Sequence, residues 1–479
     1  MKLVETAAFI DGLWIEAAAT FEVTNPADGS VIAKVADLGA AETAVAIEAA
    51  HRAFPAWAAL TAKDRGAILR RWSDLMLAHA DDLARLMTAE QGKPLAEARG
   101  EVVYGASFID WFAEEAKRGH GQSIPTPDPN KRLMSIKQPV GVCAAIAPWN
   151  FPIAMITRKV GPALAAGCTV VVKPAAETPL CALAIARLAV EAGVPAGVLN
   201  VVTGKDASAI GKALCDDPRV RKLSFTGSTP VGKTLYAQCA GTMKKLSLEL
   251  GGNAPFIVFD DADLEAAVDG AIASKYRNTG QTCVCANRLI VQSGIHDAFV
   301  ERLTQKVAAM KVGPGTGEGV TIGPLINEKA LEKVEALVAE AVKQGAKVET
   351  GGERHGLAGL FYQPTVLTGA TAGMRLFNEE IFGPVAPIVK FETEAEAIDL
   401  ANATPFGLAA YFYSRDVGRC WRVAEAIEAG MVGINEGLIS TEVAPFGGVK
   451  ESGLGREGAS EGLDEYFETK YLCFGGVKG

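Results

Sequence analysis

The sequence predicts an α/β fold with two domains, each built around a mostly parallel sheet. From Val140 onward, short apolar segments of strand length alternate with segments of helical periodicity. Strands separated by helices of this length indicate parallel βαβ units of the Rossmann type, covered on both faces. A second series of this kind starts at residues 255–259, just after the pair Gly251-Gly252. We therefore expect a domain boundary near these glycines, and a ligand-binding cleft between two α/β domains.

The region before residue 140 is predicted to be largely helical. Residues 61–64 are typical of a helix start, and residues 92–94 are typical of a helix end. Between them, side chains recur at steps of three and four residues, which predicts one helix with a single buried face. These side chains are Ile68, Trp72, Leu75, Met76, His79, Leu83 and Leu86. Residues 119–138 are rich in proline and contain two short extended runs, which predicts a loop or a projecting hairpin.

The alternating series defines individual elements. The predicted strands are residues 169–173, 198–202, 222–226, 244–250, 255–259 and 288–292, and the predicted helices are residues 180–192, 207–215 and 230–240.

Composition excludes several classes of function. The chain has 479 residues, which is long enough for roughly three domains. Of these residues 49% are hydrophobic and 22% charged, as is ordinary for a soluble globular protein. Its net charge of −9 gives no electrostatic reason to bind nucleic acid or an anionic membrane. The first residues do not resemble a signal peptide, and the longest apolar run is too short to span a bilayer, so we expect a cytoplasmic protein. An odd number of cysteines, nine, indicates a reducing compartment.

Cys283 lies in the segment most suggestive of chemistry, residues 278–288. Glycine and polar residues surround it just before a predicted strand, which is not a typical core setting. A nucleophilic cysteine needs an accessible thiolate and a nearby N–H group for the oxyanion that it creates. A buried loop cysteine is the alternative, and it is the more common case for a cysteine taken alone.

Two further segments contain candidate catalytic groups. Glu249 ends an apolar strand beside two glycines, where a carboxylate is either paired in a salt bridge or has the raised pKa of a general base. Asn150 lies between two aromatic residues and two prolines, so its side-chain amide is held stiffly enough to donate to an oxyanion. The alternative for Asn150 is an ordinary turn asparagine.

Two segments suggest a site that binds a nucleotide cofactor. Lys173 ends a buried strand, where it can reach cofactor hydroxyls or phosphate, or can simply be solvated. The pattern of residues 225–232 predicts a strand, a glycine turn and the start of a helix. The free N–H groups at the start of that helix can bind a diphosphate. The familiar GxGxxG pattern is absent there.

Together these segments resemble the aldehyde dehydrogenases, and the resemblance covers the whole chain. Glu249 and Cys283 are separated by the 34 residues that the family pattern requires. Six motifs match in order: PWNFP (148–152), VVKPAAETP (171–179), FTGSTPVG (225–232), LELGGN (248–253), GQTCVCANR (280–288) and EEIFGPV (379–385).

The resemblance implies a mechanism and a set of site residues. Cys283 would attack the aldehyde, Asn150 and the Cys283 N–H would hold the oxyanion of a thiohemiacetal, and Glu249 would activate water to release the acid from a thioester. The cofactor-binding residues implied are Trp149, Asn150, Lys173, Ala176, Gly227, Ser228, Leu250, Glu380 and Phe382.

The resemblance also implies how the chain is divided. Residues 1–118 and 141–250 would form a cofactor-binding domain, and residues 251–450 a catalytic domain. Residues 119–140, as a β-hairpin, and residues 451–479 would serve oligomerisation, usually as a homotetramer that is a dimer of dimers.

The expected cofactor is NADP, with NAD also usable. NAD-preferring relatives carry a carboxylate three residues after the strand-end lysine, where it would repel the 2′-phosphate of NADP. Ala176 occupies that position here, and the neighbouring Glu177 is expected to point elsewhere.

Within the family, the strongest resemblance is to succinate-semialdehyde dehydrogenases of 4-aminobutyrate breakdown. It rests on residues 156–160, 275–278, 436–440 and 445–450. It implies that Arg158, Arg277 and Ser440 hold the substrate carboxylate, although the two arginines could instead form ordinary salt bridges. Glutarate semialdehyde and sulfolactaldehyde are the alternative substrates.

Cys285 resembles the second cysteine of relatives in which the pair forms a reversible disulfide that stops catalysis. So close a spacing usually forbids that bond unless the backbone moves.

Other classes of protein fit the sequence less well. A thiol hydrolase would need a histidine base, and none of the five histidines shares a motif with Cys283. A CoA-acylating dehydrogenase has less need of Glu249, and no cluster of zinc ligands is present. A non-catalytic protein that retains the fold would not need to keep Cys283, Glu249 and Asn150.

Overall fold

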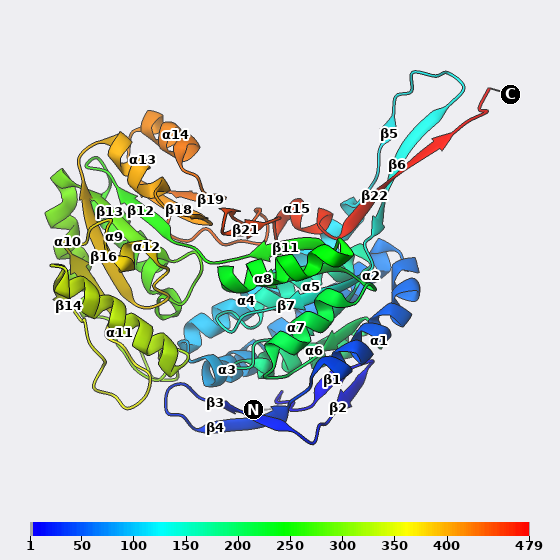
Figure 1. Cartoon of the computed structure of the whole chain (residues 1–479), viewed down its shortest axis with the longest axis horizontal. Coiled ribbons are helices and arrows are strands. Elements are labelled where there is room, and N and C mark those ends of the chain that lie inside the picture. Colours follow the sequence, from blue (N-terminus) through cyan, green and yellow to red (C-terminus); the bar gives the residue numbers. More distant parts are fainter. Residues whose placement is uncertain (1–2, 479) are drawn as a thin grey trace.

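The computed structural model describes residues 3–478, which form two lobes and a projecting arm (Figure 1). The first lobe is built on an eight-stranded sheet and the second on a seven-stranded sheet, and helices cover both. This arrangement confirms the predicted α/β class. Strand β11 belongs to the first sheet and β12 to the second, and Gly251-Gly252 lies between them. The domain ranges assigned from the sequence stay a prediction.

The eight-stranded sheet has the order β2-β1-β9-β8-β7-β10-β11-β21. Its central strands, from β9 to β11, are parallel, and its outer strands β1, β2 and β21 are antiparallel to their neighbours. Every residue of β8 is buried, as expected for a strand with helices on both faces. The strands are β1 (Ala8–Ile10), β2 (Leu13–Ile15), β7 (Val142–Ile146), β8 (Thr169–Lys173), β9 (Leu199–Val201), β10 (Val220–Thr226), β11 (Lys245–Glu249) and β21 (Gly453–Leu454).

The seven-stranded sheet has the order β14-β15-β16-β13-β12-β18-β19. All of its pairings are parallel except that of β14 with β15. The strands are β12 (Ala254–Val258), β13 (Ala286–Gln292), β14 (Lys347–Thr350), β15 (Thr365–Thr368), β16 (Val385–Phe391), β18 (Ala409–Tyr413) and β19 (Met431–Ile434). A separate two-stranded ladder joins β17 (Phe406–Gly407) to β20 (Val449–Lys450).

The helices pack on these sheets. They are α1 (Ala40–Ala59), α2 (Ala62–Ala78), α3 (Ala80–Gln91), α4 (Leu95–Glu115), α5 (Ala154–Ala166), α6 (Pro179–Ala192), α7 (Ala207–Asp216), α8 (Thr229–Cys239), α9 (Leu264–Tyr276), α10 (Ser293–Ala308), α11 (Glu328–Lys343), α12 (Arg375–Asn378), α13 (Glu394–Asn402), α14 (Val417–Ala426) and α15 (Ala459–Asp464). The three predicted helices match α6, α7 and α8 to within one residue at each end, and the predicted strands match β8 to β13 to within two.

Two predictions for the N-terminal region are wrong. The single helix expected from residue 61 is two helices, α2 and α3, because the backbone of His79 leaves the helical conformation at φ −105° and ψ 19°. The region also contains strands as well as helices. Besides β1 and β2, the strands β3 (Thr20–Thr24) and β4 (Val31–Ala36) form an antiparallel pair. Because these strands are short, their apolar pattern is weaker than the helical periodicity that dominates the rest of the region.

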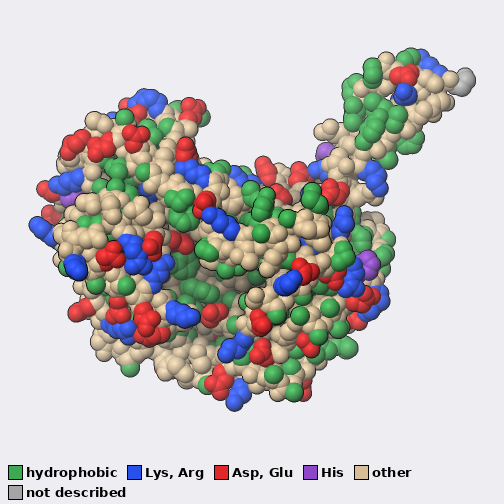
Figure 2. All heavy atoms as spheres, viewed as in Figure 1, with side chains coloured by type: hydrophobic (Ala, Val, Ile, Leu, Met, Phe, Trp, Pro, Cys, Tyr) green, Lys and Arg blue, Asp and Glu red, His purple; other side chains and the backbone are tan. Residues whose placement is uncertain are grey.

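The segment predicted as a loop or hairpin is part of a three-stranded arm. Strands β5 (Ser123–Ile124) and β6 (Arg132–Pro139) pair with each other, and β22 (Phe467–Phe474) near the C-terminus pairs along the whole of β6. The arm extends away from both lobes (Figure 1). Figure 2 shows hydrophobic side chains along it, and Tyr471 and Phe474 are at least half exposed.

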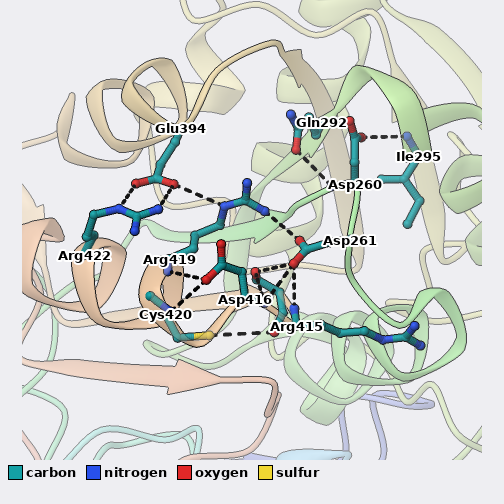
Figure 3. A network of polar contacts seen from close by, with 12 residues as sticks. Asp260, Asp261, Gln292, Ile295, Glu394, Arg415, Asp416, Arg419, Cys420 and Arg422 are labelled. Atoms are coloured by element: carbon teal, nitrogen blue, oxygen red, sulfur yellow. Dashed lines mark hydrogen bonds and ion pairs between the residues drawn. The ribbon is translucent and has the colours of Figure 1, made fainter.

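A polar network fixes α13 and α14 to the edge of the second lobe (Figure 3). The carboxylate of Asp261 accepts hydrogen bonds from the Ser414 hydroxyl and from the N–H groups of Arg415 and Asp416, each at 2.9 Å. Asp261 also pairs with Arg419, which contacts Glu394 on α13 as well. The network therefore joins the loop after β12 to both helices.

Candidate active site

A cavity of about 350 Å³ lies between the two lobes. It is bordered by the segments that follow the carboxyl ends of the parallel strands β7, β10 and β11, which is where α/β sheets bind ligands. The second lobe contributes Cys283, the start of α11 and the loop before β16. The lining residues are Pro148, Trp149, Asn150, Thr226, Gly227, Ser228, Leu250, Gly251, Cys283, Lys329, Ala330, Lys333, Glu380, Ile381 and Phe382.

The structure brings most of the residues singled out in the sequence to this cavity. Those that line it are Trp149, Asn150, Gly227, Ser228, Leu250, Cys283, Glu380 and Phe382. Glu249 immediately precedes Leu250 of the lining and is buried behind it. Lys173 and Ala176 are not among the lining residues, nor are Arg158, Arg277 and Ser440.

Cys283 is half-buried at the cavity wall, on the loop between α9 and β13. Its main chain packs against Gly252, where a Cβ atom would lie 2.2 Å from the Cys283 carbonyl oxygen. Only glycine fits there, which explains part of the LELGGN motif. Burial, and then the charge of Glu380, raise the pKa of the Cys283 thiol to about 12. The charges of Arg158 and Arg277 oppose that shift and favour the ionised thiol.

Glu249 is buried at the end of β11, with only 1% of its surface exposed. Neither carboxylate oxygen has a hydrogen-bond partner among the described residues, and the carboxylate forms no ion pair with them. Within the described residues, Glu249 therefore does not form the salt bridge that the sequence left open as an alternative. Burial, and then the nearby charge of Glu457, raise the pKa of Glu249 well above its ordinary value. A carboxyl group in this state can take a proton from water only after it has ionised.

Asn150 follows β7 and is buried. Its Nδ2 atom donates a hydrogen bond to the main-chain carbonyl of Gln281 at 3.0 Å, while its Oδ1 atom has no partner among the described residues. The amide nitrogen keeps a second N–H group, and Asn150 shares the cavity wall with Cys283.

The cofactor side of the cavity has features that suit a dinucleotide. Helix α8 begins at Thr229, and no side chain caps its first N–H groups, which leaves them available to an anion. The rings of Trp149 and Phe382 meet edge to face, with centroids 5.5 Å apart. The carboxylate of Glu380 accepts a hydrogen bond from the Gly252 N–H at 3.0 Å, and burial raises the pKa of Glu380 to about 7.

Two lysines of α11 also line this cavity, and the sequence motifs did not reveal them. Lys333 donates a hydrogen bond to the Glu380 carbonyl at 2.6 Å, and Lys329 lies one helical turn before it. The only available signal was a strongly amphipathic segment far from every motif, and such a pattern predicts a surface helix rather than a ligand site.

Arg158 and Arg277 lie in different settings. Arg158, on α5, is buried and forms an ion pair with Glu457, and its guanidinium carbon lies 3.8 Å from the centre of the Phe446 ring. Arg277 forms no ion pair with any described residue and lies over Phe151 at 5.4 Å. The alternative of an ordinary salt bridge thus applies to Arg158 but not to Arg277.

Arg277 also borders a second cavity. Its volume is about 320 Å³, and Glu97, Tyr276 and Leu438 are among the residues that line it. Ser440 is half-buried two residues beyond Leu438.

The thiol of Cys285 is buried and bonds to main-chain carbonyl groups. It donates a hydrogen bond to the Lys275 carbonyl at 3.3 Å, and burial raises its pKa. Both Cys283 and Cys285 are free thiols, and their disulfide stays a prediction.

Among residues 3–478, no group of three or more histidine, cysteine, aspartate or glutamate side chains could hold a metal ion. No described helix is both long and apolar enough to cross a membrane.

Comparison with known proteins identifies the family. The aldehyde dehydrogenase family model matches residues 14–472. The chain is 61% identical to the succinate-semialdehyde dehydrogenase [NADP(+)] of Escherichia coli K12, over 99% of this chain and 98% of that one. It is 60% identical to the glutarate-semialdehyde dehydrogenase of Pseudomonas aeruginosa (99% of both chains) and 59% identical to the 3-sulfolactaldehyde dehydrogenase of Pseudomonas putida (99% and 98%).

A solved structure agrees with these matches. The crystal structure of succinate-semialdehyde dehydrogenase from Burkholderia pseudomallei superposes with a TM-score of 0.98, at 62% identity, over 99% of this chain and 98% of that one. The resemblance seen in the sequence motifs is thereby confirmed. The chain belongs to the aldehyde dehydrogenase family, and it is an NAD(P)-dependent aldehyde dehydrogenase.

Proposed function

We propose that this chain oxidises succinate semialdehyde to succinate, with NADP as the preferred cofactor and NAD as a usable one. One observation carries the proposal: the Cys283 thiol shares a cavity wall with Asn150, and the charges of Glu249, Arg158 and Arg277 all reach it. In this proposal Cys283 is the nucleophile, Asn150 the oxyanion donor and Glu249 the base, and the two arginines bind the anionic end of the substrate.

The chemistry begins at the thiol. Cys283 gives up its proton to solvent, and the sulfur attacks the aldehyde carbon to give a thiohemiacetal. The oxyanion of that species accepts hydrogen bonds from the second N–H of Asn150 and from the main-chain N–H of Cys283. Loss of hydride leaves an acyl group bound to the sulfur as a thioester.

Glu249 completes the reaction. Its ionised carboxylate takes a proton from water, the water oxygen attacks the thioester carbon, and the carbon–sulfur bond breaks to release the acid and restore the Cys283 thiolate. The raised pKa of Glu249 makes its carboxylate a stronger base toward that water, and the carboxyl group returns the proton to solvent before the next cycle.

The cofactor would lie along the cavity of the first lobe. Gly227 and Ser228, at the start of α8, would lie by the diphosphate, while Lys173 and Glu380 would bind ribose hydroxyls. Trp149, Leu250 and Phe382 would line its groove. When bound, the nicotinamide ring supplies the hydride acceptor.

The preference for NADP rests on Ala176. This position holds no carboxylate that would repel a 2′-phosphate. The relative from E. coli is named as an NADP(+) enzyme, which supports the same choice.

The proposed substrate rests on the two arginines. A guanidinium group left unpaired would disfavour an uncharged aldehyde, and Arg277 forms no ion pair with the described residues. Ser440 would add a hydroxyl donor. Glutarate semialdehyde and sulfolactaldehyde remain the second candidates, because relatives named for them are almost as similar as the succinate-semialdehyde enzyme.

We also propose that the arm joins copies of this chain into a dimer of dimers. The exposed side chains of Ile124, Met134, Tyr471 and Phe474 support this role, because they would be covered in an assembly.

The test is a panel of aldehydes assayed with both cofactors. We expect kcat/KM to be highest for succinate semialdehyde with NADP, and roughly 100-fold lower for butyraldehyde, which lacks the charge-assisted contacts. Highest activity with glutarate semialdehyde or sulfolactaldehyde would transfer the proposal to that substrate. Equal activity with butyraldehyde would overturn the anionic site itself.

A further inference from the structure

The loop before Cys283 contains a strained turn that the proposed mechanism does not use. Asn278, Thr279 and Gly280 all have left-handed backbones, with φ of 51°, 58° and 75°. This conformation is costly for a residue with a side chain, above all for β-branched threonine, and persists only where the surroundings impose it. At Gly280, a Cβ atom would lie 2.2 Å from the Gly383 carbonyl oxygen, so the chain approaches that loop too closely for any side chain.

The side chain of Asn278 bridges two segments of the site. It is fully buried, and its Nδ2 atom donates to the Asn150 carbonyl at 3.0 Å and to the Gln281 carbonyl at 3.2 Å. Its Oδ1 atom accepts a hydrogen bond from Nε2 of Gln91 at 3.0 Å, which fixes the direction of the amide. The Asn278 N–H is also satisfied, because it donates to the carboxylate of Glu97 at 2.7 Å.

The two carbonyl groups that Asn278 holds are those that define the position of Asn150. The Gln281 carbonyl is the acceptor for the Asn150 side-chain amide, and it lies two residues before Cys283. The Asn150 carbonyl also accepts a hydrogen bond from Lys93 at 2.7 Å, and Lys93 forms a buried ion pair with Glu101. One amide group thus spans the segment with the oxyanion donor and the segment with the thiol.

We propose that Asn278 is a positioning residue for the oxyanion site, which sets the separation between the Asn150 amide and the Cys283 loop. The inference rests on the roles proposed above for Asn150 and Cys283. Asn278 acts through Asn150 and contacts no reacting atom. Without its bridge, the hydrogen bond from Nδ2 of Asn150 to the Gln281 carbonyl still joins the two segments, but it no longer has Asn278 beside it to fix its direction.

The central experiment is a double-mutant cycle on the hydride step. Asn278→Gly removes the bridging amide but tolerates the left-handed backbone. We expect it to slow single-turnover formation of reduced cofactor by about 10- to 100-fold, the range for a displaced catalytic group. In Asn150→Ala the group being positioned is already absent, so adding Asn278→Gly should cost no more than about twofold further.

Two additional readouts separate positioning from general damage. The rate at which iodoacetamide alkylates Cys283 without cofactor should stay within about twofold of the wild type, since the thiol itself is not displaced. Thr279→Ser is the matched control: it lies in the same turn and keeps the hydroxyl that accepts from the Gly323 N–H at 3.0 Å, so its single-turnover rate should be nearly unchanged.

A second variant keeps the inference testable if Asn278→Gly does not fold. Gln91→Glu retains the oxygen that accepts from the Lys93 N–H but places a second acceptor against Oδ1 of Asn278. The Asn278 amide then rotates to donate to residue 91 and turns its oxygen toward Asn150. We expect a slower hydride step that is again not additive with Asn150→Ala.

The outcomes distinguish the inference from the function on which it rests. If Asn150→Ala leaves the hydride step unchanged, the proposed role of Asn150 is wrong. A second outcome is that Asn150→Ala slows that step, but Asn278→Gly or Gln91→Glu lowers its rate by the same factor whether or not Asn150 is present. The positioning role is then overturned, and the proposed function stands.

Discussion

The guanidinium group of Arg158 forms a buried ion pair with the carboxylate of Glu457, and Glu457 also pairs with the neighbouring Lys159. Arg158 therefore shares one carboxylate with a second cation, and Glu457 compensates its charge only in part. Arg277 has no such partner among the described residues. Of the two arginines proposed to hold the substrate, Arg277 is the one without an ion pair, while Nη2 of Arg158 is a buried donor with no hydrogen-bond partner among the described residues.

Replacement of Arg277 should mainly affect the binding of charged aldehydes. In Arg277→Ala we expect the KM for succinate semialdehyde to rise by about 10- to 100-fold, because a charge-assisted hydrogen bond is lost. The KM for butyraldehyde should change by less than about threefold. Arg302→Ala, which removes an exposed arginine paired with Glu265, is the control. An unchanged KM for the semialdehyde would remove Arg277 from the substrate site.

A carboxylate at position 176 should change the cofactor preference. In Ala176→Asp the new charge would lie where the 2′-phosphate of NADP is proposed to bind, so kcat/KM with NADP should fall by about tenfold or more. Activity with NAD should be retained or increased. Glu177→Gln, which changes the charge of the adjacent residue, should leave the preference as it is. Steady-state kinetics with both cofactors measure this, and an unaltered ratio in Ala176→Asp would contradict it.

The state of ionisation of Glu249 should control thioester hydrolysis. Because burial and Glu457 raise the pKa of Glu249, the rate of this step should increase as the pH rises through neutral and alkaline values. Glu249→Gln should show a burst of reduced cofactor followed by a steady rate about 100-fold or more slower, without that pH dependence. A linear time course at the wild-type rate would exclude Glu249 as the base.

The same group should make the enzyme less stable at high pH. Above the ordinary carboxyl pKa, the folded state retains a proton that the unfolded state has lost, so the free energy of unfolding falls as the pH rises toward the raised pKa. Glu249→Gln lacks this group. Its Tm relative to the wild type should therefore increase between pH 5 and pH 8.

Glu380 should limit the reactivity of the thiol. Its charge is the largest contribution after burial to the raised pKa of Cys283. In Glu380→Gln we expect iodoacetamide to alkylate Cys283 several-fold faster at pH 8, since more of the sulfur is ionised. Cys283→Ser identifies the labelled residue. A slower reaction in Glu380→Gln would show that the carboxylate does not act on the thiol through its charge.

The network around Asp261 should be sensitive to acid. Burial alone would raise the pKa of Asp261, but the Ser414 hydroxyl and the N–H groups of Asp416 and Arg415 outweigh it and lower the pKa. The stability that these contacts provide is present at neutral pH and is lost as the pH falls through the lowered pKa. Between pH 5 and pH 3, the Tm of the wild type should therefore fall further than that of Asp261→Asn. Asp399→Asn, at an exposed position of α13, should behave like the wild type.

The sequence predicted the elements that depend on local pattern. The strands β8 to β13 and the helices α6 to α8 were found because apolar periodicity and glycine turns define them without reference to distant residues. The short strands β3 and β4 were missed, since each depends on pairing with its neighbour rather than on its own composition. The break at His79 was missed because both helices present a buried face at the same spacing.

In the active site, too, the residues that local motifs define could be predicted, while those that depend on distant parts of the chain could not. Cys283, Asn150 and Glu380 were identified because their motifs are local, and they do line one cavity. The pairing of Lys159 with Glu457 joins residues 298 positions apart, so no motif could indicate it. Lys333 on α11 reaches the cavity only because the second lobe places that helix there.

At Gly280 the loop that holds the thiol touches the Gly383 carbonyl with no side chain between them. At this point the loop that continues from Glu380 and Phe382 at the cofactor groove meets the thiol loop through main-chain atoms. Side chains can absorb a displacement by rotating, whereas two packed backbones cannot. A displacement of Gly383 would therefore press on the thiol loop at Gly280.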